Sequence, residues 1–475
     1  MKRNKWYIIV VGVFFLVGIM VYHINDYDYA TIYDQNGEEL VRLEAGWDKN
    51  FGEESLLQGD IVVDSVIYQL IEDMEKSGFN QEEIIKGLNY SGWKVYSTIS
   101  VEIQKELSTY YSIKDTFNEI EEQWENIPQS SMVVMNYNGE IQALVGGTNG
   151  DNQCNRARRK LYQIGSTIKP VSIYAPILND NLIHYSSLVE DIPTSIYLNG
   201  KLTEWPTNAD GKYEGQITIA DALAVSKNAV PVILGNQYGT EKIYNYLKDN
   251  FYSTMVNENM RSDIDVSALA MGYFNDGVSL DELVGSYVPF GNDGKYRGVT
   301  CYTHVKDKNN KDIFEYSRQD KQIMSGETAY IINRLLLNNV EAENGIAKGA
   351  RMEGVEVAGK TGTVGKDGRN IRKLFVGMTP EYVIGLQFSY DEIRPLMGNE
   401  LTNTAIWRNY VETINLKEKE FKKNDNVVSQ QYCIHSGGTP GDSCEKVAIG
   451  YYTMDNFPDE CTKCEYIKNY MENLE

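Results

Sequence analysis

The sequence predicts an α+β fold in which an antiparallel sheet is covered by helices, with a central all-helical subdomain between its strands. The strands are expected as a hairpin at 131–147 and as single strands at 355–363, 374–379 and 382–390. Asn138-Gly139 supplies the turn of the hairpin. A helix-rich stretch at 166–337 separates the two groups of strands. Strands at both ends of a helical block are typical of one sheet that the chain leaves and rejoins.

An apolar segment near the N-terminus predicts an N-terminal transmembrane helix. No residue from Trp6 to Ile24 carries a full charge, and about 19 helical residues span about 29 Å, close to the ~30 Å hydrocarbon core. Basic residues precede the segment and acidic residues follow it, which predicts a cytoplasmic tail and an exported bulk. Because no small-x-small cleavage pattern follows, an uncleaved single-pass anchor is favoured over a cleaved signal peptide or a buried core helix.

Between the anchor and the first hairpin of the sheet, the sequence predicts several local elements. A short hairpin at 31–43 turns at Asn36-Gly37, and a glycine- and acid-rich linker follows at 44–60. Apolar residues at helical spacing predict a helix at 62–77, and alternation predicts a strand at 93–101.

Composition excludes several classes of function. The chain has 45 basic and 67 acidic residues, a net charge of −22, which argues against a nucleic-acid partner. Only four histidines occur among 475 residues, so a His-rich metal site or a Ser-His-Asp triad is not expected. We expect no cofactor and no metal in the catalytic machinery.

Ser166-Thr167-Ile168-Lys169 is the first motif that carries chemistry. On one helical turn the serine and lysine side chains face the same side, and a buried lysine can lose its charge and activate the serine. The motif alone is weak, because on the order of two S-x-x-K matches are expected by chance. Two other matches begin at Ser91 and Ser443, the first leading into an apparent strand and the second in the tail.

Two further motifs follow downstream. Ser226-Lys227-Asn228 offers a second hydroxyl near the lysine and an amide that can bind a peptide backbone, although helix caps are the ordinary explanation for such residues. Lys360-Thr361-Gly362-Thr363 lies on an apparent strand, where the lysine and the hydroxyls can bind a carboxylate. No single motif is decisive, but the ordered set is specific.

The order S-x-x-K, S-x-N, K-T-G resembles the signature of active-site serine penicillin-recognising enzymes. Neighbouring residues, including Asn155-Arg156-Ala157 and Trp205-Pro206-Thr207-Asn208, resemble class A penicillin-binding proteins. The resemblance covers roughly 62–475. It implies Ser166 as nucleophile, Lys169 as its base, Ser226 as proton relay, and a substrate-binding set of Asn228, Lys360, Thr361, Gly362 and Thr363. The implied oxyanion hole is formed by the backbone N–H groups of Ser166 and Thr363.

The sequence departs from the class A pattern in two places. Fewer than 30 residues separate the hairpin at 31–43 from the helix at 62–77, too few for the glycosyltransferase domain that class A proteins carry there. Arg372-Lys373-Leu374 replaces an Asp-Ala-Trp-like stretch, which bears on substrate preference at the cleft edge. The expected segments are a cytoplasmic tail (1–5), the transmembrane anchor (6–24), a membrane-proximal hairpin and linker (25–61), a linker domain (62–127), a transpeptidase domain (128–415) and a cysteine-containing tail (416–475).

The resemblance implies a membrane-anchored, monofunctional D-Ala-D-Ala transpeptidase that cross-links peptidoglycan stem peptides and is inhibited by penicillin. The expected partners are stem peptides, β-lactam antibiotics, the membrane and a separate glycosyltransferase, with the catalytic domain outside the cytoplasm. A D,D-carboxypeptidase, a β-lactamase or a β-lactam sensor uses the same fold and differs in acceptor or deacylation. An inactive cell-wall assembly scaffold is the alternative from another class.

The chain contains six cysteines: Cys154, Cys301, Cys433, Cys444, Cys461 and Cys464. Export of the chain favours disulfides. The tail also contains a C-x-x-C pair, which is a common zinc ligand pair, so disulfides, zinc and unpaired thiols all stay open at this point.

Overall fold

The computed structural model describes residues 27–53, 55–112, 128–148, 153–198, 201–258, 260–317, 319–366, 368–396 and 402–472. The anchor expected at 6–24 and the tail before it lie outside these residues. Within the described ranges, no helix is both long enough and apolar enough to cross a membrane. The anchor and the segment boundaries therefore stay predictions.

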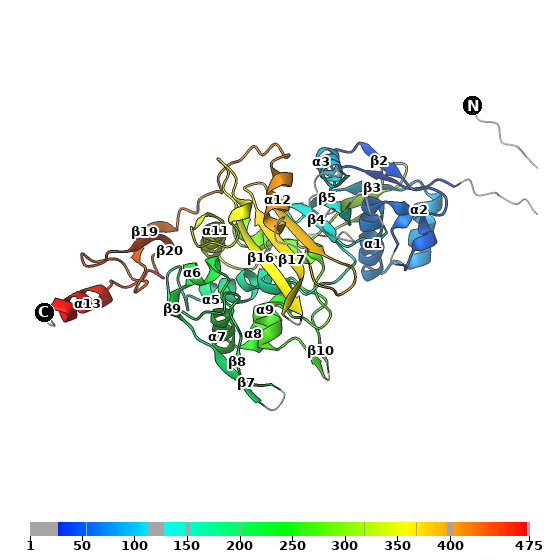
Figure 1. Cartoon of the computed structure of the whole chain (residues 1–475). Coiled ribbons are helices and arrows are strands. Elements are labelled where there is room, and N and C mark those ends of the chain that lie inside the picture. The colour runs from blue at the N-terminus through cyan, green and yellow to red at the C-terminus, as the bar shows by residue number, and fades with distance from the viewer. Residues whose placement is uncertain are drawn as a thin grey trace, which may run out of the picture.

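A five-stranded antiparallel sheet forms the centre of the molecule, in the order β16-β17-β18-β4-β5 (Figure 1). Its strands are β4 (Gln129–Asn136), β5 (Ile141–Val145), β16 (Ala358–Lys366), β17 (Arg369–Met378) and β18 (Tyr382–Ser389). The predicted hairpin pairs with the last predicted strand, because β4 runs antiparallel to β18 along its whole length. The predicted α+β class and antiparallel sheet are confirmed. Strand β17 begins earlier than expected, because four of its first five residues are polar and show no apolar alternation.

Alternate residues of the sheet enter two separate cores, as the two-residue period of a strand requires. Val133 and Met135 of β4 pack on the face of the sheet that contacts the central helical block, whereas Met132 and Val134 pack on the opposite face. Helices α3 (Val101–Ser112) and α12 (Asn403–Val411) contribute to the core on this opposite face. Helices α10 (Leu280–Gly285) and α11 (Gly326–Glu341) belong to the central helical block and contribute to the core on the first face. Both faces are therefore covered, and the edge strand β16 is left at the border of the helical block.

The expectation of an all-helical central subdomain is wrong. Its other helices are α5 (Ala175–Asn179), α6 (Ile219–Ala224), α7 (Ala229–Tyr238), α8 (Thr240–Asn250) and α9 (Val266–Met271), with 3-10 turns η4 (Gly165–Ile168), η6 (Val288–Gly291) and η7 (Lys348–Ala350). Two-stranded ribbons interrupt them: β6 (Leu188–Asp191) with β9 (Gly215–Thr218), β7 (Thr194–Leu198) with β8 (Lys201–Trp205), β10 (Asn257–Glu258) with β11 (Arg261–Ser262), and β12 (Lys295–Tyr296) with β15 (Lys321–Gln322). Most described side chains of these ribbons are exposed, so they leave no apolar pattern in the sequence.

A second five-stranded sheet, in the order β14-β13-β3-β1-β2, joins the N-terminal segment to the helical block. Its strands are β1 (Thr31–Tyr33), β2 (Glu39–Arg42), β3 (Lys94–Ser97), β13 (Tyr302–Lys306) and β14 (Asp312–Glu315). The predicted hairpin at 31–43 is confirmed, and β1 runs parallel to β3. The strand expected at 93–101 ends at Ser97, because Ser100 begins α3 by accepting a hydrogen bond from the N–H of Ile103.

The segment expected to be a linker at 44–60 is folded. It contains η1 (Trp47–Asn50) and η2 (Leu57–Gly59), and Trp47, Leu56 and Leu57 are buried. Helix α1 (Ile61–Lys76) follows as predicted, and Asp60 caps it by accepting hydrogen bonds from two N–H groups of its first turn. Helix α2 (Gln81–Tyr90) was not predicted. The C-terminal tail carries β19 (Val428–Cys433), β20 (Val447–Tyr452) and α13 (Lys463–Glu472), at the opposite end from the N-terminal segment (Figure 1).

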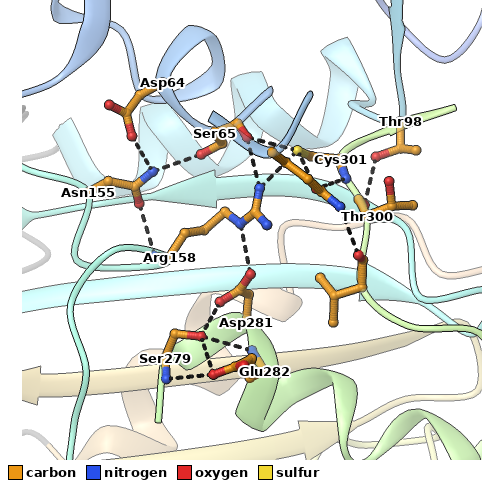
Figure 2. Close-up of polar contacts among 12 residues, drawn as sticks. Asp64, Ser65, Thr98, Asn155, Arg158, Ser279, Asp281, Glu282, Thr300 and Cys301 are labelled. Atoms are coloured by element: carbon orange, nitrogen blue, oxygen red, sulfur yellow. Dashed lines mark hydrogen bonds and ion pairs between the residues drawn. The ribbon is translucent and has the colours of Figure 1, made fainter. Parts of the chain in front are cut away.

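A buried polar network joins α1 to the loop at 155–158 and to α10 (Figure 2). Asn155 donates hydrogen bonds to Asp64 and Ser65 of α1, at 2.9 and 2.8 Å. Arg158 donates to the carbonyl of Ser65 at 2.9 Å and forms an ion pair with Asp281 of α10 at 2.7 Å. The loop that leads to Ser166 is thus tied to the N-terminal segment on one side and to α10 on the other.

Replacing Arg158 with Met is expected to lower the free energy of unfolding by about 3–5 kcal/mol, because it leaves the Asp281 carboxylate buried without its cation. The two side chains are only 14% and 6% exposed. Arg261→Met is the control, since Arg261 pairs with Asp276 at an exposed site and should cost about 0–1 kcal/mol. Urea denaturation followed by tryptophan fluorescence measures both. Equal losses for the two variants would contradict the expectation.

Candidate active site

Ser166 lies on η4, where the helical block meets the edge strand β16. Gly165 has a φ of +57°, and a Cβ there would lie 2.6 Å from the carbonyl oxygen of Thr363 and 3.0 Å from its nitrogen. Only glycine fits this close approach. The backbone N–H and C=O of Thr363 therefore face the turn that carries Ser166, and not the neighbouring strand β17.

The helix expected after Ser166 is irregular at its start. The 3-10 turn passes into five residues of π-helix (Pro170–Tyr174) before the α-helical α5 begins. Tyr287 fixes the position of the 3-10 turn, because its hydroxyl donates a hydrogen bond to the carbonyl of Thr167 at 2.6 Å. Departures of this kind from α-helix often occur at functional sites.

Lys169 is fully buried, and its Nζ is surrounded by oxygen acceptors. It donates to Oδ1 of Asn228 at 2.7 Å, to the carbonyl oxygens of Lys227 and Ser226 at 2.9 and 3.1 Å, and to Oγ of Ser226 at 3.5 Å. Burial lowers the pKa of Lys169 well below its usual range, and the nearby charge of Lys360 lowers this pKa further. The first two motifs of the sequence therefore meet at this amine.

Lys360 on β16 reaches the same hydroxyl from the other side. Its Nζ donates to Oγ of Ser226 at 2.7 Å and to the carbonyl oxygen of Thr361 at 3.1 Å. Burial lowers the pKa of Lys360 to about 7. The Ser226 hydroxyl thus lies between two lysine amines, and burial lowers the pKa of both.

The backbone of Ser226 is strained. Its φ is +57°, a left-handed conformation that non-glycine residues rarely adopt. The residue lies between α6 and α7, where its N–H donates to the carbonyl of Leu223 and that of Lys227 donates to the carbonyl of Ala222. Strain of this kind persists only where the surroundings hold it, and it clusters at functional sites.

A buried ion-pair network supplies that support. Lys227 lies within 3.2 Å of Asp191 and 3.1 Å of Asp210, and although burial opposes its charge, bonds to Asp210 and Asp191 raise the pKa of Lys227. Asn208 donates to Asp191 at 2.7 Å and accepts from the N–H of Asn228 at 2.7 Å. Sequence reasoning found Asn208 only through its family resemblance and missed Asp191 and Asp210, because no local pattern connects them to the motif.

The side-chain amide of Asn228 forms hydrogen bonds within the protein through both its oxygen and its nitrogen. Its Oδ1 accepts from Lys169, and its Nδ2 donates to the carbonyl of Thr207 at 2.8 Å. One N–H of the amide is left for a substrate, and the side chain is half-buried. Asn228 therefore orients Lys169, in addition to the substrate-binding role that the resemblance implies.

Strand β16 presents the third motif along the border of the site. Gly362 faces η4, since a Cβ there would lie 2.6 Å from the carbonyl of Ile164. Thr361 is half-buried and Thr363 is exposed. Because β16 is an edge strand of the sheet, no described strand pairs with its outer side, which is the side where an extended peptide could pair. All eight predicted site residues are thus brought to one place, where β16, η4 and the turn between α6 and α7 meet.

Arg372 and Lys373 lie on β17, opposite Val364 and Thr363 of β16. The Arg372 guanidinium stacks on the ring of Tyr162, 4.5 Å from its centre. Burial lowers the pKa of Lys373. The departure noted in the sequence therefore adds two basic residues beside Thr363 and the rest of the third motif.

Among the residues that the structure describes, one group could hold a metal ion. It consists of Cys433, Cys444, Cys461 and Cys464, all in the tail and outside the site built around Ser166.

The family model of the penicillin binding protein transpeptidase domain matches residues 130–389. Penicillin-binding protein 1A of Clostridium perfringens strain 13 is 29% identical over 378 residues, covering 75% of this chain and 54% of that protein. Penicillin-binding protein 1F of Bacillus subtilis is 27% identical over 337 residues, covering 69% of this chain and 43% of that protein. The chain thus spans about half the length of the curated relatives that it matches.

Solved structures share the fold. Penicillin-binding protein 1A of Haemophilus influenzae superposes with a TM-score of 0.65 at 17% identity, covering 89% of this chain and 78% of that chain. The D,D-transpeptidase domain of a peptidoglycan glycosyltransferase from Eggerthella lenta gives a TM-score of 0.58 at 20% identity, covering 82% and 98%. The family model spans more than half of the chain and includes all eight site residues. The chain belongs to the penicillin-binding protein transpeptidase family.

Proposed function

We propose that the protein is a membrane-anchored serine D-Ala-D-Ala transpeptidase that cross-links peptidoglycan stem peptides and has no glycosyltransferase activity. One observation supports this most strongly. The Ser226 hydroxyl lies 2.7 Å from Nζ of Lys360 and 3.5 Å from Nζ of Lys169, beside the turn that carries Ser166. Proton transfer around a serine nucleophile requires such a chain of titratable groups.

Acylation begins at Ser166. Its hydroxyl loses a proton to Lys169, which burial keeps neutral enough to accept one, and Oγ attacks the carbonyl carbon of the penultimate D-Ala. The N–H of Thr363 faces the same turn, so it can stabilise the developing oxyanion together with the N–H of Ser166. A tetrahedral intermediate results, with its negative charge on the former carbonyl oxygen.

Collapse of this intermediate requires a proton on the departing amine. Lys169, now an ammonium, passes its proton through the Ser226 hydroxyl, and the C–N bond breaks to release D-Ala. Ser166 is left as an ester of the donor peptide. An amine of a neighbouring stem peptide then attacks the ester carbonyl carbon. Its proton passes through the same relay to Oγ of Ser166, the ester C–O bond breaks, and the new peptide bond is left with Ser166 restored.

Residues of strand β16 bind the terminal carboxylate of the substrate in this proposal. Lys360 supplies the positive charge, and the hydroxyls of Thr361 and Thr363 are the neighbouring donors. The peptide can pair with the outward backbone groups of this edge strand, which places its carbonyl against η4. A β-lactam carries a comparable carboxylate and amide, and the related fold of PonA1 from Mycobacterium tuberculosis was solved in complex with penicillin V.

The segment between β2 and α1 supports the absence of glycosyltransferase activity. It contains two 3-10 turns, and Trp47, Leu56 and Leu57 are buried in the main core, so no further domain fits there. A separate glycosyltransferase is the partner that would supply glycan strands.

Reconstitution with glycan strands that carry pentapeptides tests the proposal. The expected products are cross-linked peptides and free D-Ala in equal amounts, both abolished by penicillin. Free D-Ala without cross-links would assign a carboxypeptidase instead. Rapid hydrolysis of penicillin would assign a β-lactamase, a stable penicillin adduct without D-Ala release would assign a sensor, and no reaction at all would assign a scaffold.

The anchor is tested separately, on the protein extracted from membranes. N-terminal sequencing is expected to find residues 6–24 still attached, because no cleavage pattern follows the apolar run. A protease added to intact protoplasts should digest the region beyond residue 27 and spare a cytoplasmic control protein. An N-terminus beyond residue 20 would refute the anchor.

A further inference from the structure

Four cysteines that are far apart in the sequence meet in the C-terminal tail. Cys433 ends β19, Cys444 lies in the loop before β20, and Cys461 and Cys464 stand at the start of α13. Their four Sγ atoms all lie within 4.8 Å of one another. Three of the side chains are buried and Cys444 is half-buried.

The spacing of the sulfur atoms fits a tetrahedral metal site. Zinc–sulfur bonds of ~2.3 Å place the sulfurs of a tetrahedral site with four cysteine ligands about 3.8 Å apart. Sγ of Cys433 lies 3.5 Å from Sγ of Cys464. Disulfides would instead divide the four sulfurs into two pairs at ~2.05 Å. None of the four is paired in this way, since all are free thiols in the structure.

Backbone hydrogen bonds hold the segments that carry the cysteines in a tight turn. After Cys433 the chain turns back sharply, so that its carbonyl accepts hydrogen bonds from Ser436 and Gly437 and its N–H donates to Gly438. Cys461 is joined to the same turn, because its N–H donates to the carbonyl of Thr439 at 2.8 Å. Two segments separated by more than twenty residues are therefore held side by side at the cysteines.

The tail has no other core at this place. The four cysteines form a cluster of their own, which no other apolar side chain joins among the described residues. Units of this size usually need disulfides or a bound metal to hold their shape. Whatever links the four sulfurs thus holds the start of α13 against the turn after Cys433, at the end of the tail ribbon.

We propose that Cys433, Cys444, Cys461 and Cys464 bind one Zn²⁺ as a structural site. All four ligands come from the protein, so no position is left open for a substrate, which is the pattern of structural and not catalytic zinc. Binding releases the thiol protons to solvent and leaves four thiolates on the metal. The site is independent of the reaction proposed at Ser166.

The position of the site indicates what it stabilises. Ser186, at the start of the segment that leads into β6, donates to the carbonyl of Gly437 at 2.6 Å, and Lys463 donates to Gln216 of β9 at 3.4 Å. Ribbon β6–β9 leads directly into α6, which precedes Ser226. Zinc therefore fixes the tail against the ribbon that borders the helical block.

The test uses the full chain, exported and extracted from membranes without reducing agent, with free thiols alkylated at lysis. Metal analysis by mass spectrometry is expected to find one zinc per chain. Intact mass and peptide mapping after removal of zinc by a chelator should show no disulfide among the four tail cysteines. Two disulfides among the four tail cysteines, or one equivalent of iron in place of zinc, would overturn the proposal.

Two variants and a control complete the test. Cys444→Ser and Cys461→Ser should each lose the zinc and expose the tail to trypsin, whereas Cys154→Ser, outside the cluster, should keep one zinc per chain. Penicillin labelling should persist in all three, which separates loss of the metal from misfolding. Zinc retained at one equivalent in both cluster variants would overturn the assignment. If a variant fails to fold, the metal and thiol content of the unaltered chain decides alone.

Discussion

Ser166→Ala is expected to abolish covalent labelling by penicillin, with a loss of acylation rate on the order of 10⁶-fold, as for removal of other serine nucleophiles. The change removes one oxygen atom at the junction of η4 and β16. Ser166 is only half-buried, and no described residue forms a hydrogen bond with its Oγ, so the loss of this atom leaves no buried partner unsatisfied. The fold and the thermal stability should therefore be unchanged.

The chain offers matched controls for this experiment. Ser91→Ala and Ser443→Ala alter the two other S-x-x-K matches, which lie at the end of α2 and in the tail loop. Both variants should be labelled at the same rate as the unaltered protein. Peptide mapping of the adduct by mass spectrometry should place it on Ser166 alone. Labelling of a folded Ser166→Ala variant would end the assignment of the nucleophile.

The central sheet and the site could be predicted from sequence for different reasons. Strands β4, β5 and β18 are buried on both faces, so their apolar residues form continuous runs that stand out from the rest of the chain. The site residues were found because three motifs occur in a fixed order, at Ser166, Ser226 and Lys360. Neither inference required knowledge of contacts between distant segments.

Contacts between distant segments account for what was missed. Strand β13 completes the N-terminal sheet by pairing with β3, more than 200 residues earlier, and nothing local predicts this partner. Asp191 supports Ser226 only through Lys227 and Asn208, so its role appears only in three dimensions. The left-handed backbone of Ser226 likewise follows from these surroundings and not from the residue itself.

The tail cysteines illustrate the same limit. Their spacing left disulfides, zinc and free thiols open, because spacing along the chain does not determine distances between sulfur atoms. The turn after Cys433 and the hydrogen bond from Cys461 to Thr439 bring the four sulfurs together. Only that convergence favours one metal ion over two separate pairs.

The charges of Lys169 and Lys360 determine how acylation responds to substitution. Lys169→Arg should reduce the acylation rate by ~10²–10⁴-fold, because a guanidinium stays protonated and cannot serve as a base. Lys360→Arg should retain much of the rate that Lys360→Ala loses, since arginine still binds a carboxylate. Circular dichroism and the melting temperature check that each variant is folded.

The dependence of penicillin acylation on pH then separates the two roles. The second-order rate constant reports pKa values of the free enzyme. Lys360 is cationic below its pKa of about 7 and neutral above it, so carboxylate recognition and the rate should fall as the pH rises through about 7. Lys360→Arg should remove this alkaline decline, because its charge persists. Protonation of Lys169 should make the rate fall at low pH. Lys360→Ala should move this acid decline to higher pH, because the charge of Lys360 helps to lower the pKa of Lys169.

Two outcomes would contradict these roles. Near-native acylation by Lys169→Arg at pH 7 would show that another group activates Ser166. An unchanged alkaline decline in Lys360→Arg would show that Lys360 does not bind the carboxylate as a cation.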